Sequence, residues 1–412
     1  MDNRPSDHRF AHFRDQFLGA KQSIYMDVAA RGLISTSVRE AIDTYLNHRM
    51  VQGADKAWMF DEVEKTRESF ARLINADPTE IAFTKNVSDG INAFASAIRW
   101  DRGDNVVICE ALEHPANVYP WYNLKELLGI QLKRVNPENG QIPFDRLIAS
   151  ADEKTRVITV SSVSFSPGAR FPVAELGLFC RSRDILLLVD AAQSIGVLDT
   201  DVRALKIDAL ATSTQKGLLA LYGGGFLYVR RQVADALSPR YLSRFGVQSD
   251  SQHEAESGAL DKIRLAPGAR RFDVGNYNFL AAIAVKRSLQ DLHGLGIQNV
   301  ERRVCGLATR LADGFDELGL AMFGRDSKAQ SHIIAVGKAL SHQHDTTDDR
   351  RILELYSHLK SRGVKLTIRR GLLRFSLHAY NNEDDVDQVT EVVRQWQRTC
   401  SAASSVDSTF LR

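Results

Sequence analysis

The sequence predicts an α/β protein, with a mostly parallel seven-stranded sheet flanked by helices and a smaller α+β domain at the C-terminal end. Between about residues 80 and 230, short apolar or β-branched runs alternate with amphipathic stretches, as strands and crossover helices do in a parallel sheet. Several of these runs lack polar alternation, which is typical of strands buried on both faces. Beyond Gly275, long helical stretches precede short strands, and this change of pattern indicates the second domain.

The strands of the large sheet are expected at residues 81–84, 105–109, 131–135, 156–161, 185–190, 209–213 and 225–229. Helices between them are expected at 88–98, 115–128 and 172–181. Two of these helices begin with Pro115 and Pro172 in the first turn, where proline removes no needed donor. The C-terminal part should contain helices 279–292, 297–318 and 383–396 and strands near 332–336 and 372–377.

The chain length predicts two domains, because 412 residues exceed what one hydrophobic core usually supports. We expect a large domain over residues 20–293 and a small domain over 294–400, on which residues 1–19 can pack. Residues 401–412 are expected to form a flexible tail.

The composition excludes several function classes. Hydrophobic residues make up 44% and charged residues 25% of the chain, as in an ordinary folded protein. The net charge of +2 gives no broad attraction to nucleic acid or to a membrane surface, so neither is an expected partner. The apolar runs are too short to span a bilayer and the N-terminus is polar, so a cytoplasmic location is the default.

Metal, disulfide and dinucleotide sites are not indicated. The cysteines are far apart and show no metal-ligand spacing, at Cys109, Cys180, Cys305 and Cys400. His342 and His344 lie in a polar stretch without a third ligand beside them, and we assign no metal to them. The glycines at 223–225 precede a strand instead of opening a helix, which excludes a dinucleotide-binding loop.

An acid and an amine are predicted at one edge of the sheet. Asp190 ends one expected strand, Gln193 follows it, and Lys216 comes shortly after the next expected strand. The carboxyl ends of parallel strands meet at one edge, where α/β sheets bind ligands. The spacing therefore brings Asp190 and Lys216 to one crevice.

Two neighbouring segments extend this crevice. Residues 84–92 place hydroxyl, amide and glycine residues, among them Ser88, between a strand and a helix start, where free N–H groups favour a phosphate. Glu113-His114-Pro115 lies at another strand-to-helix turn and offers a flat ring for stacking on an aromatic ligand. A phosphate site, a flat ring and an amine together suggest the cofactor pyridoxal 5'-phosphate.

Seven segments in this order resemble the class V aminotransferase and cysteine desulfurase-like family of pyridoxal-phosphate enzymes, which has fold type I. The segments are YMDVAARG from Tyr25, FTKNVSDGIN from Phe83, EHPANVYPW from Glu113, VDAAQ from Val189, STQKGLLALYGGGFLYV from Ser213, RFDVGNYN from Arg271 and LRFSLHAYNNEDDVD from Leu373.

The resemblance implies a role for each matching cofactor residue. Lys216 corresponds to the Schiff-base lysine, Asp190 to the partner of the pyridinium nitrogen, His114 to the stacking residue and Gln193 to the contact of the phenolic oxygen. The phosphate would be held by residues at the helix start and around the lysine, namely Val87, Ser88, Ser213 and Gln215, with Asn276 from a second subunit. The family members are dimers with shared sites, so the resemblance implies a homodimer.

On the substrate side, Arg374 matches the arginine that takes the α-carboxylate, and Ala29 and Arg31 match a substrate-side loop. A planar guanidinium fits a carboxylate through two parallel hydrogen bonds. Arg31 is either a solvated arginine or a contact for an acidic side chain. Arg369 and Arg370 likewise form either a solvated turn or a site for a second anionic group on the substrate.

Three departures from the family pattern bear on the reaction. Gln215 stands where the family usually has histidine, and Phe165 where desulfurases commonly have asparagine. Desulfurases also carry a cysteine on a mobile loop shortly before the carboxylate arginine, whereas residues 363–374 contain none. A persulfide-forming desulfurase is therefore not expected.

We expect a homodimeric, cytoplasmic pyridoxal-phosphate enzyme that acts at the Cα of an amino acid, with transamination as the first choice. The alternatives within enzymes are a β-eliminating C–S lyase and an amino-acid epimerase. A catalytically silent pyridoxal-phosphate-binding protein is the remaining alternative, against which Lys216, Asp190 and Arg374 argue.

Overall fold

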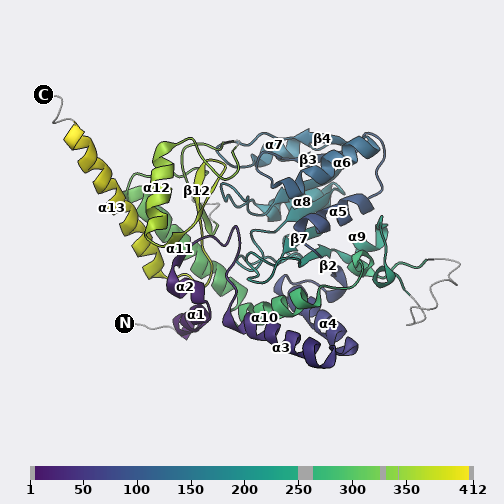
Figure 1. Cartoon of the computed structure of the whole chain (residues 1–412). Coiled ribbons are helices and arrows are strands. Elements are labelled where there is room, and N and C mark those ends of the chain that lie inside the picture. Colours follow the sequence, from purple (N-terminus) through teal and green to yellow (C-terminus); the bar gives the residue numbers. More distant parts are fainter. Residues whose placement is uncertain (1–4, 249–262, 325–330, 342, 408–412) are drawn as a thin grey trace.

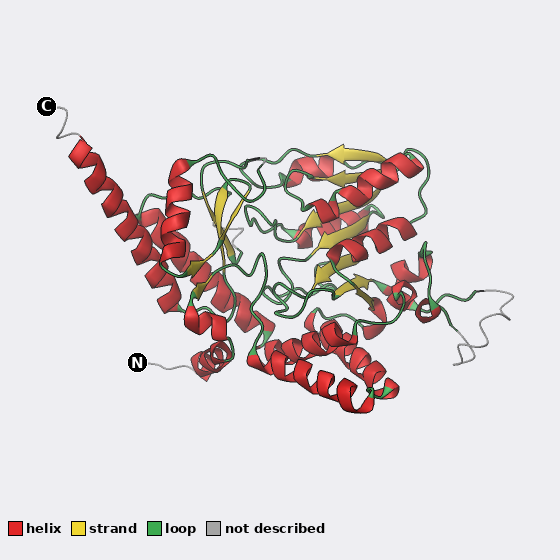
Figure 2. Ribbon diagram, viewed as in Figure 1, coloured by secondary structure: helices red, strands yellow, loops and turns green. Residues whose placement is uncertain are grey.

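The protein is built around a seven-stranded sheet with helices on both faces (Figures 1 and 2). The computed structural model describes residues 5–248, 263–324, 331–341 and 343–407. The strand order is β2-β8-β7-β6-β5-β3-β4. The bounds are β2 Ile81–Thr84, β3 Asn105–Ile108, β4 Gln131–Arg134, β5 Thr155–Ser161, β6 Leu186–Asp190, β7 Ala209–Ser213 and β8 Gly225–Val229.

The sequence prediction of a mostly parallel seven-stranded sheet is confirmed. Strand β8 runs antiparallel to its neighbours β2 and β7, whereas β7, β6, β5, β3 and β4 are parallel to one another. Each predicted strand coincides with an observed one to within a residue at either end. The match follows from burial, because strands covered on both faces form the continuous apolar runs that are read directly from the sequence.

Successive residues of the strands pack into two different hydrophobic clusters. Val106 and Ile108 contact the side of α5 (Val87–Ala97) and α6 (Tyr119–Leu128), while Val107 belongs to the cluster on the opposite face. That opposite face is covered by helices that include α4 (Lys56–Leu73), α8 (Val173–Ser182) and α10 (Phe279–Leu295). Shorter elements complete this part: η1 Pro78–Glu80, η2 Pro115–Asn117, α7 Phe144–Ala149, α9 Arg231–Ala236, η3 Arg244–Gly246 and η5 Gly268–Phe272.

The sequence analysis missed two long N-terminal helices, α3 (Thr36–Gln52) and α4. Both have clear start signals, because the side chain of Ser35 accepts the N–H of Val38 and the side chain of Asp55 accepts the N–H of Trp58. Gly53, at φ 71°, ends α3 in the left-handed conformation that glycine adopts readily. Helix α10 packs against both of them beside β2, in the lower part of Figure 1.

The N-terminal segment packs with the C-terminal part of the chain. Strand β1 (Ile24–Tyr25) pairs in parallel with β10 (Val364–Lys365). Ahead of β1 lie α1 (Pro5–Asp15), from which Arg14 reaches Asp385 at 2.7 Å, and α2 (Leu18–Gln22). Figure 1 shows α1 and α2 near the lower ends of α11 (Ile297–Glu317) and α13 (Glu383–Asp407), with α12 (Arg350–Ser361) packed on α13 farther up. The boundary expected at residue 293 stays a prediction.

A three-stranded antiparallel sheet carries Arg374, for which the sequence predicts a substrate-side role. Its order is β11-β12-β9, with β9 Ile333–Val336, β11 Thr367–Arg369 and β12 Leu372–Ser376. Helix α13 continues to Asp407, past residue 401 at which the flexible tail was expected to begin, and its sequence contains no glycine or proline to stop it. In the described part of the chain, no helix is long and apolar enough to cross a membrane.

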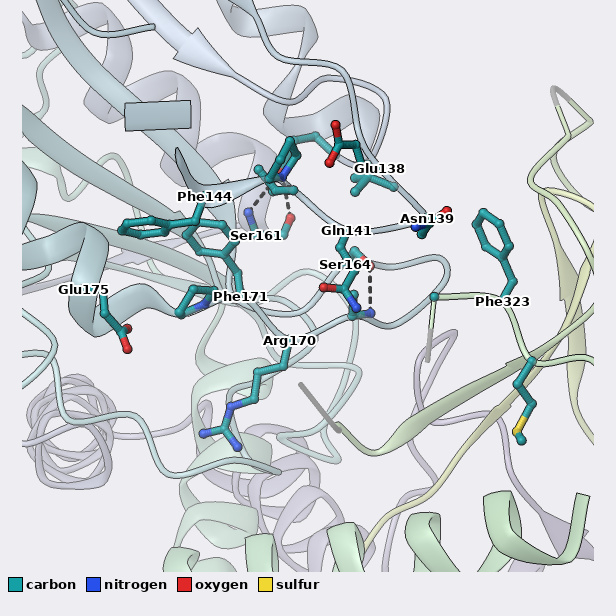
Figure 3. A pocket seen from close by; sticks show the side chains of 18 of the residues that line it. Glu138, Asn139, Gln141, Phe144, Ser161, Ser164, Arg170, Phe171, Glu175 and Phe323 are labelled. Atoms are coloured by element: carbon teal, nitrogen blue, oxygen red, sulfur yellow. Dashed lines mark hydrogen bonds between the residues drawn. The ribbon is translucent and has the colours of Figure 1, made fainter. Parts of the chain in front are cut away.

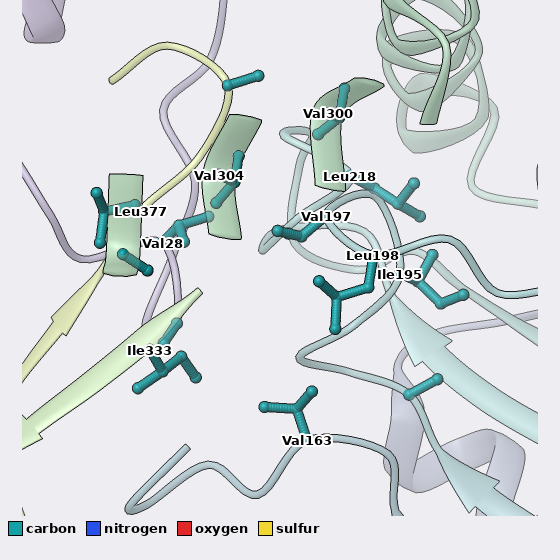
Figure 4. Packing of buried hydrophobic residues seen from close by; sticks show 14 of the residues in the cluster. Val28, Val163, Ile195, Val197, Leu198, Leu218, Val300, Val304, Ile333 and Leu377 are labelled. Atoms are coloured by element: carbon teal, nitrogen blue, oxygen red, sulfur yellow. The ribbon is translucent and has the colours of Figure 1, made fainter. Parts of the chain in front are cut away.

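One hydrophobic core joins these parts beneath the crevice. Figure 4 shows Val28 of the N-terminal segment, Leu218 beside the predicted lysine, Val300 of α11, Ile333 of β9 and Leu377 after β12 in one cluster. The side chains are buried and come from segments far apart in sequence. This packing fixes the lysine loop against the sheet that carries Arg374.

Candidate active site

The carboxyl ends of three neighbouring strands form the base of the site. Ser161, Asp190 and Ser213 are the last residues of β5, β6 and β7. The register pairs Ser161 with Asp190 and Asp190 with Ala211, so these strand ends lie side by side. This is the edge at which the sequence placed the acid and the amine.

Asp190 and Lys216 face one another at this edge. Asp190 is buried, and its Oδ1 accepts the N–H of Ala192 at 2.9 Å. Burial raises the pKa of Asp190, an effect that the Ala192 N–H and the charge of Lys216 oppose. Lys216 is half-buried in the turn after β7, and desolvation lowers its pKa to about 8, against the opposite pull of Asp190. An amine with this pKa is partly neutral near physiological pH.

His114 presents a neutral ring to the site. It caps η2, and its Nδ1 accepts the N–H of Ala116 at 3.2 Å, which leaves the ring proton on Nε2. Burial, followed by the charge of Lys216, lowers the pKa of His114 to about 4. Its ring meets that of Phe165 edge-on, with centroids 5.4 Å apart.

Glu113 anchors the loop that carries His114, a role that the sequence analysis did not assign. Its carboxylate accepts the backbone N–H and the hydroxyl of Ser161, each at 2.6 Å, and the side-chain N–H of Asn117 at 2.8 Å. Desolvation, followed by the charge of Asp190, raises the pKa of Glu113 to about 7. The signal was present in the sequence, because Glu113 and Asn117 both belong to the EHPAN segment.

Buried polar atoms without partners face the place expected for the cofactor. Among the described residues, Ser213 Oγ and Gln193 Oε1 are buried and have no hydrogen-bond partner. Native proteins rarely leave such atoms unpaired, so they fit a polar ligand. Gln193 donates one amide N–H to the carbonyl of Ala29 at 3.1 Å, and its second N–H is free to reach a ring oxygen.

The phosphate end fits the start of helix α5. Val87 and Ser88 open this helix, and the side chain of Asn86 caps it by accepting the N–H of Asp89 at 2.9 Å. The N–H groups of the first turn would suit an anion such as a phosphate. Beside this helix start, an open hollow of about 940 Å³ is lined by Asn86, Gly225 and the exposed Asn276, among others.

Arg374 lies on β12 with its side chain 2% exposed. It donates to the carbonyl of Phe165 at 2.8 Å and to the hydroxyl of Thr367 at 3.2 Å, and it lies 3.7 Å from the carboxylate of Asp27. Its Nε is buried without a partner in the described part of the chain. Desolvation lowers the pKa of Arg374 to about 10. The guanidinium thus remains a cation with an unused donor.

The polar contacts of Arg374 include residues that the sequence analysis missed. Asp27 Oδ1 accepts the hydroxyl of Thr367 at 2.9 Å, across 340 residues of sequence. Burial raises the pKa of Asp27, and the charge of Arg374 opposes this rise. The motif segments contain Asp27, but its proximity to Thr367 depends on pairing that the sequence does not reveal.

Residues 27–32 connect the cofactor and substrate sides. The N–H of Ala29 donates to the hydroxyl of Ser376 at 2.9 Å, while its carbonyl accepts from Gln193. The N–H of Gly32 donates to the carbonyl of Gln215 at 2.8 Å. Gln215 is half-buried, and Arg31 is exposed at the rim.

His378 holds the backbone beside the lysine. It is buried, and its Nδ1 accepts the N–H of Ala379 at 2.7 Å, so its Nε2–H donates to the carbonyl of Gly217 at 2.9 Å. Burial lowers the pKa of His378 to about 4, which keeps the ring neutral. His378 was present in the motif from Leu373 but received no role there.

A second hollow of about 1200 Å³ is lined by Glu113 and by residues that include Phe144, Ser164 and Phe171 (Figure 3). Two of its charged side chains are in ion pairs: Arg170 pairs with Glu301 at 2.6 Å, and Glu138 pairs with Arg146 at 2.5 Å. Neither Lys216 nor Arg374 lines this hollow.

No cluster of three or more possible metal ligands occurs in the described ranges, and His342 lies outside them. His344 is exposed and contacts Asp345 at 2.7 Å. The expectation that His342 and His344 bind no metal stays a prediction.

Comparisons with known proteins identify the family and the fold. The family model described as aminotransferase class-V matches residues 24–389. A probable cysteine desulfurase of Pyrococcus abyssi is 28% identical over 91% of this chain and 94% of its own. The structure is similar to apo cysteine desulfurase from Thermococcus onnurineus, with a TM-score of 0.78, 26% identity and coverage of 94% and 97% of the two chains. It is also similar in fold to the cystine C–S lyase C-DES, in a variant with glycine linked to its pyridoxal-phosphate cofactor, with a TM-score of 0.80, 21% identity and coverage of 92% and 98%.

Proposed function

The chain belongs to the aminotransferase class-V family, whose cofactor is pyridoxal phosphate, and from that premise we propose that it acts at the Cα of an amino acid by transamination. The supporting observation is a pair of basic side chains at one crevice: the half-buried Lys216, of lowered pKa, in the turn after a strand, and the buried Arg374, whose Nε is unpaired in the described structure. The lysine amine can bond to a carbonyl carbon, and the arginine guanidinium can bind a carboxylate.

Pyridoxal phosphate supplies an aldehyde carbon for the lysine and a ring that accepts the electron pair released at the substrate Cα. Asp190 is placed to hold a proton on a ring nitrogen through a charge-assisted hydrogen bond. His114 offers its neutral ring for stacking, and Ser213 and the start of α5 offer donors to the phosphate. These roles are supported by the orphaned hydroxyl and by the strand-end positions.

Lys216 is proposed to carry the proton at its Nζ between Cα and the cofactor. Its pKa of about 8 leaves a useful fraction of neutral amine, so Nζ can accept a proton and then release it. His378 restrains the adjoining carbonyl of Gly217 and thereby limits where Nζ can move.

Arg374 is proposed to orient the substrate through its α-carboxylate. Its contacts with Phe165 and Thr367 fix the guanidinium plane, and Nε remains available for the ligand. Asp27 balances part of its charge before the substrate binds. We also propose a homodimer in the cytoplasm, in which Asn276, exposed beside the phosphate end, contacts the cofactor of the partner subunit.

Cleavage of a carbon–sulfur bond is the second candidate, because similar proteins include cysteine desulfurases and a cystine C–S lyase. These names favour desulfuration at least as strongly as transamination. The chain itself provides less support: it has no cysteine between Cys305 and Cys400, and the segment before Arg374 is a two-residue turn at Arg370 and Gly371.

The reactions separate by their products. The purified protein is saturated with pyridoxal phosphate and mixed with a panel of amino acids that includes cysteine and cystine, while absorbance, keto acid, ammonia and sulfide are measured. Transamination predicts keto acid without ammonia and turnover only with a keto-acid acceptor. A lyase releases ammonia, keto acid and reduced sulfur without an acceptor, and a desulfurase yields alanine and transferable sulfur from cysteine. Release of reduced sulfur would refute transamination in favour of a lyase, and formation of alanine with transferable sulfur would refute it in favour of a desulfurase.

A further inference from the structure

An additional arginine lies beside Arg374 on the same hairpin. The register places Thr367 opposite Arg374 and Arg369 opposite Leu372. Side chains alternate along a strand and directly opposed residues share a face, so Arg369 lies on the same face as Thr367 and Arg374. Diagonal neighbours on such a face are about 7–8 Å apart, within reach of long side chains.

Arg369 is at the rim of the crevice. Its carbonyl accepts the hydroxyl of Ser166 at 3.4 Å, and the adjacent Phe165 contacts both His114 and Arg374. Its charge contributes to the lowered pKa values of Lys216 and Arg374. The next residue, Arg370, is directed elsewhere, since it donates to the carbonyl of Ala111.

The present partner of Arg369 is a surface carboxylate. Asp345 contacts its guanidinium, and His344 Nδ1 lies 3.3 Å from it. The Asp345 side chain is 67% exposed, whereas that of Arg369 is 19% exposed. An ion pair with an exposed carboxylate contributes little free energy. A ligand whose other carboxylate is held by Arg374 can therefore displace Asp345 from Arg369.

We propose that Arg369 binds a second carboxylate of the substrate, so that the enzyme takes an acidic amino acid of the size of aspartate or glutamate. The α-carboxylate lies on Arg374 and the side-chain carboxylate on Arg369, which Asp345 occupies until the substrate arrives. This inference rests on the proposed function for the role of Arg374 and names the substrate class of that site.

The test uses inert acids, so that binding is measured without turnover. The holoenzyme is titrated with succinate and glutarate, and with butyrate and pentanoate as monocarboxylates of matching length. Cofactor absorbance and Tm are followed. We expect the dicarboxylates to bind at least about tenfold more tightly, since a charged hydrogen bond distinguishes the two series.

Variants on both sides of the ion pair sharpen the test. Arg369→Gln should remove the preference for dicarboxylates and leave monocarboxylate binding in place. Asp345→Asn should tighten dicarboxylate binding, because it removes the internal competitor. Arg350→Gln is the matched control, as this arginine is 90% exposed on α12 and pairs with Glu354; it should behave as the wild type.

Equal binding of the two acid series, or a preference that survives Arg369→Gln, would overturn the inference. The result is separable from the proposed function. Arg369-dependent dicarboxylate binding in a protein that transaminates nothing would refute transamination and retain the subsite. Transamination of neutral amino acids without any dicarboxylate preference would retain the proposed function and refute the Arg369 subsite.

Discussion

The cofactor half and the substrate half of the site are constructed differently. Asp190 and Ser213 end neighbouring strands, and Lys216 follows within the next turn, so these three residues of the proposed cofactor half come from one continuous stretch. Arg374 instead depends on Phe165, 209 residues away, and on Thr367, which in turn holds Asp27 across 340 residues. Strand ends thus place the residues proposed for the general chemistry, whereas long-range pairing places those proposed to bind the substrate.

The largest effect should come from the cofactor half. Lys216→Ala removes the amine that bonds to the cofactor, so the absorbance band of the imine should disappear and kcat should fall by on the order of 10²–10⁴ or more. Lys365→Ala, which changes an exposed side chain of β10, is the control and should keep both properties. An unchanged band in Lys216→Ala would refute the assignment of the lysine.

A change confined to the substrate half should leave the cofactor half intact. Arg374→Lys keeps the charge but loses the planar fork, so kcat/KM should fall by about ten- to a hundredfold. The absorbance band and the affinity for pyridoxal phosphate should stay as in the wild type. If the variant instead loses the cofactor, Arg374 supports both halves and the division between them is wrong.

The sequence was sufficient for the sheet and for the position of Asp190 and Lys216 at one edge of it, while their roles stay a prediction. Buried parallel strands have continuous apolar runs, and the polar residues at their ends, such as Asp190 and Lys216, fall at one edge whatever the details of packing. The roles of Asp27, Thr367 and His378 could not be derived this way. Their contacts depend on the pairing of β1 with β10 and on the register of the β11–β12 hairpin, which local patterns do not specify.

Residues 27–32 join the two halves, and adding one methyl group at Gly32 should change both the stability of the protein and the position of the lysine loop. A Cβ on Gly32 would lie 2.5 Å from the carbonyl oxygen of Lys216 and 2.5 Å from Leu219 Cδ2. Gly32→Ala should therefore lower the free energy of unfolding by about 1–3 kcal/mol, as overpacking does, and displace the lysine loop. Urea unfolding of the apoprotein measures the first effect and pyridoxal-phosphate affinity the second.

Gly306→Ala provides the matched control for this substitution. A Cβ on Gly306, within α11, meets no atom within 4 Å. Alanine is the better helix former by about 1 kcal/mol, so this variant should be as stable as the wild type or more so. Equal stability of the two variants would show that the segment 27–32 yields easily and does not fix the lysine loop.

The smallest effect should be an electrostatic one between the halves. Recombination of the apoprotein with pyridoxal phosphate needs the neutral amine of Lys216, so its rate should rise with pH and level off above the pKa of about 8. Arg374 contributes to lowering this pKa and Asp190 raises it. Arg374→Gln should therefore move the midpoint of the rate profile upward, and Asp190→Asn should move it downward, each by up to about one pH unit.

Stopped-flow absorbance across pH 6 to pH 10 measures the midpoint. Arg350→Gln, remote from Lys216, should leave it in place. An unmoved midpoint in Arg374→Gln would mean that the charge of Arg374 does not affect the pKa of Lys216. The two halves would then be in contact through packing without electrostatic coupling.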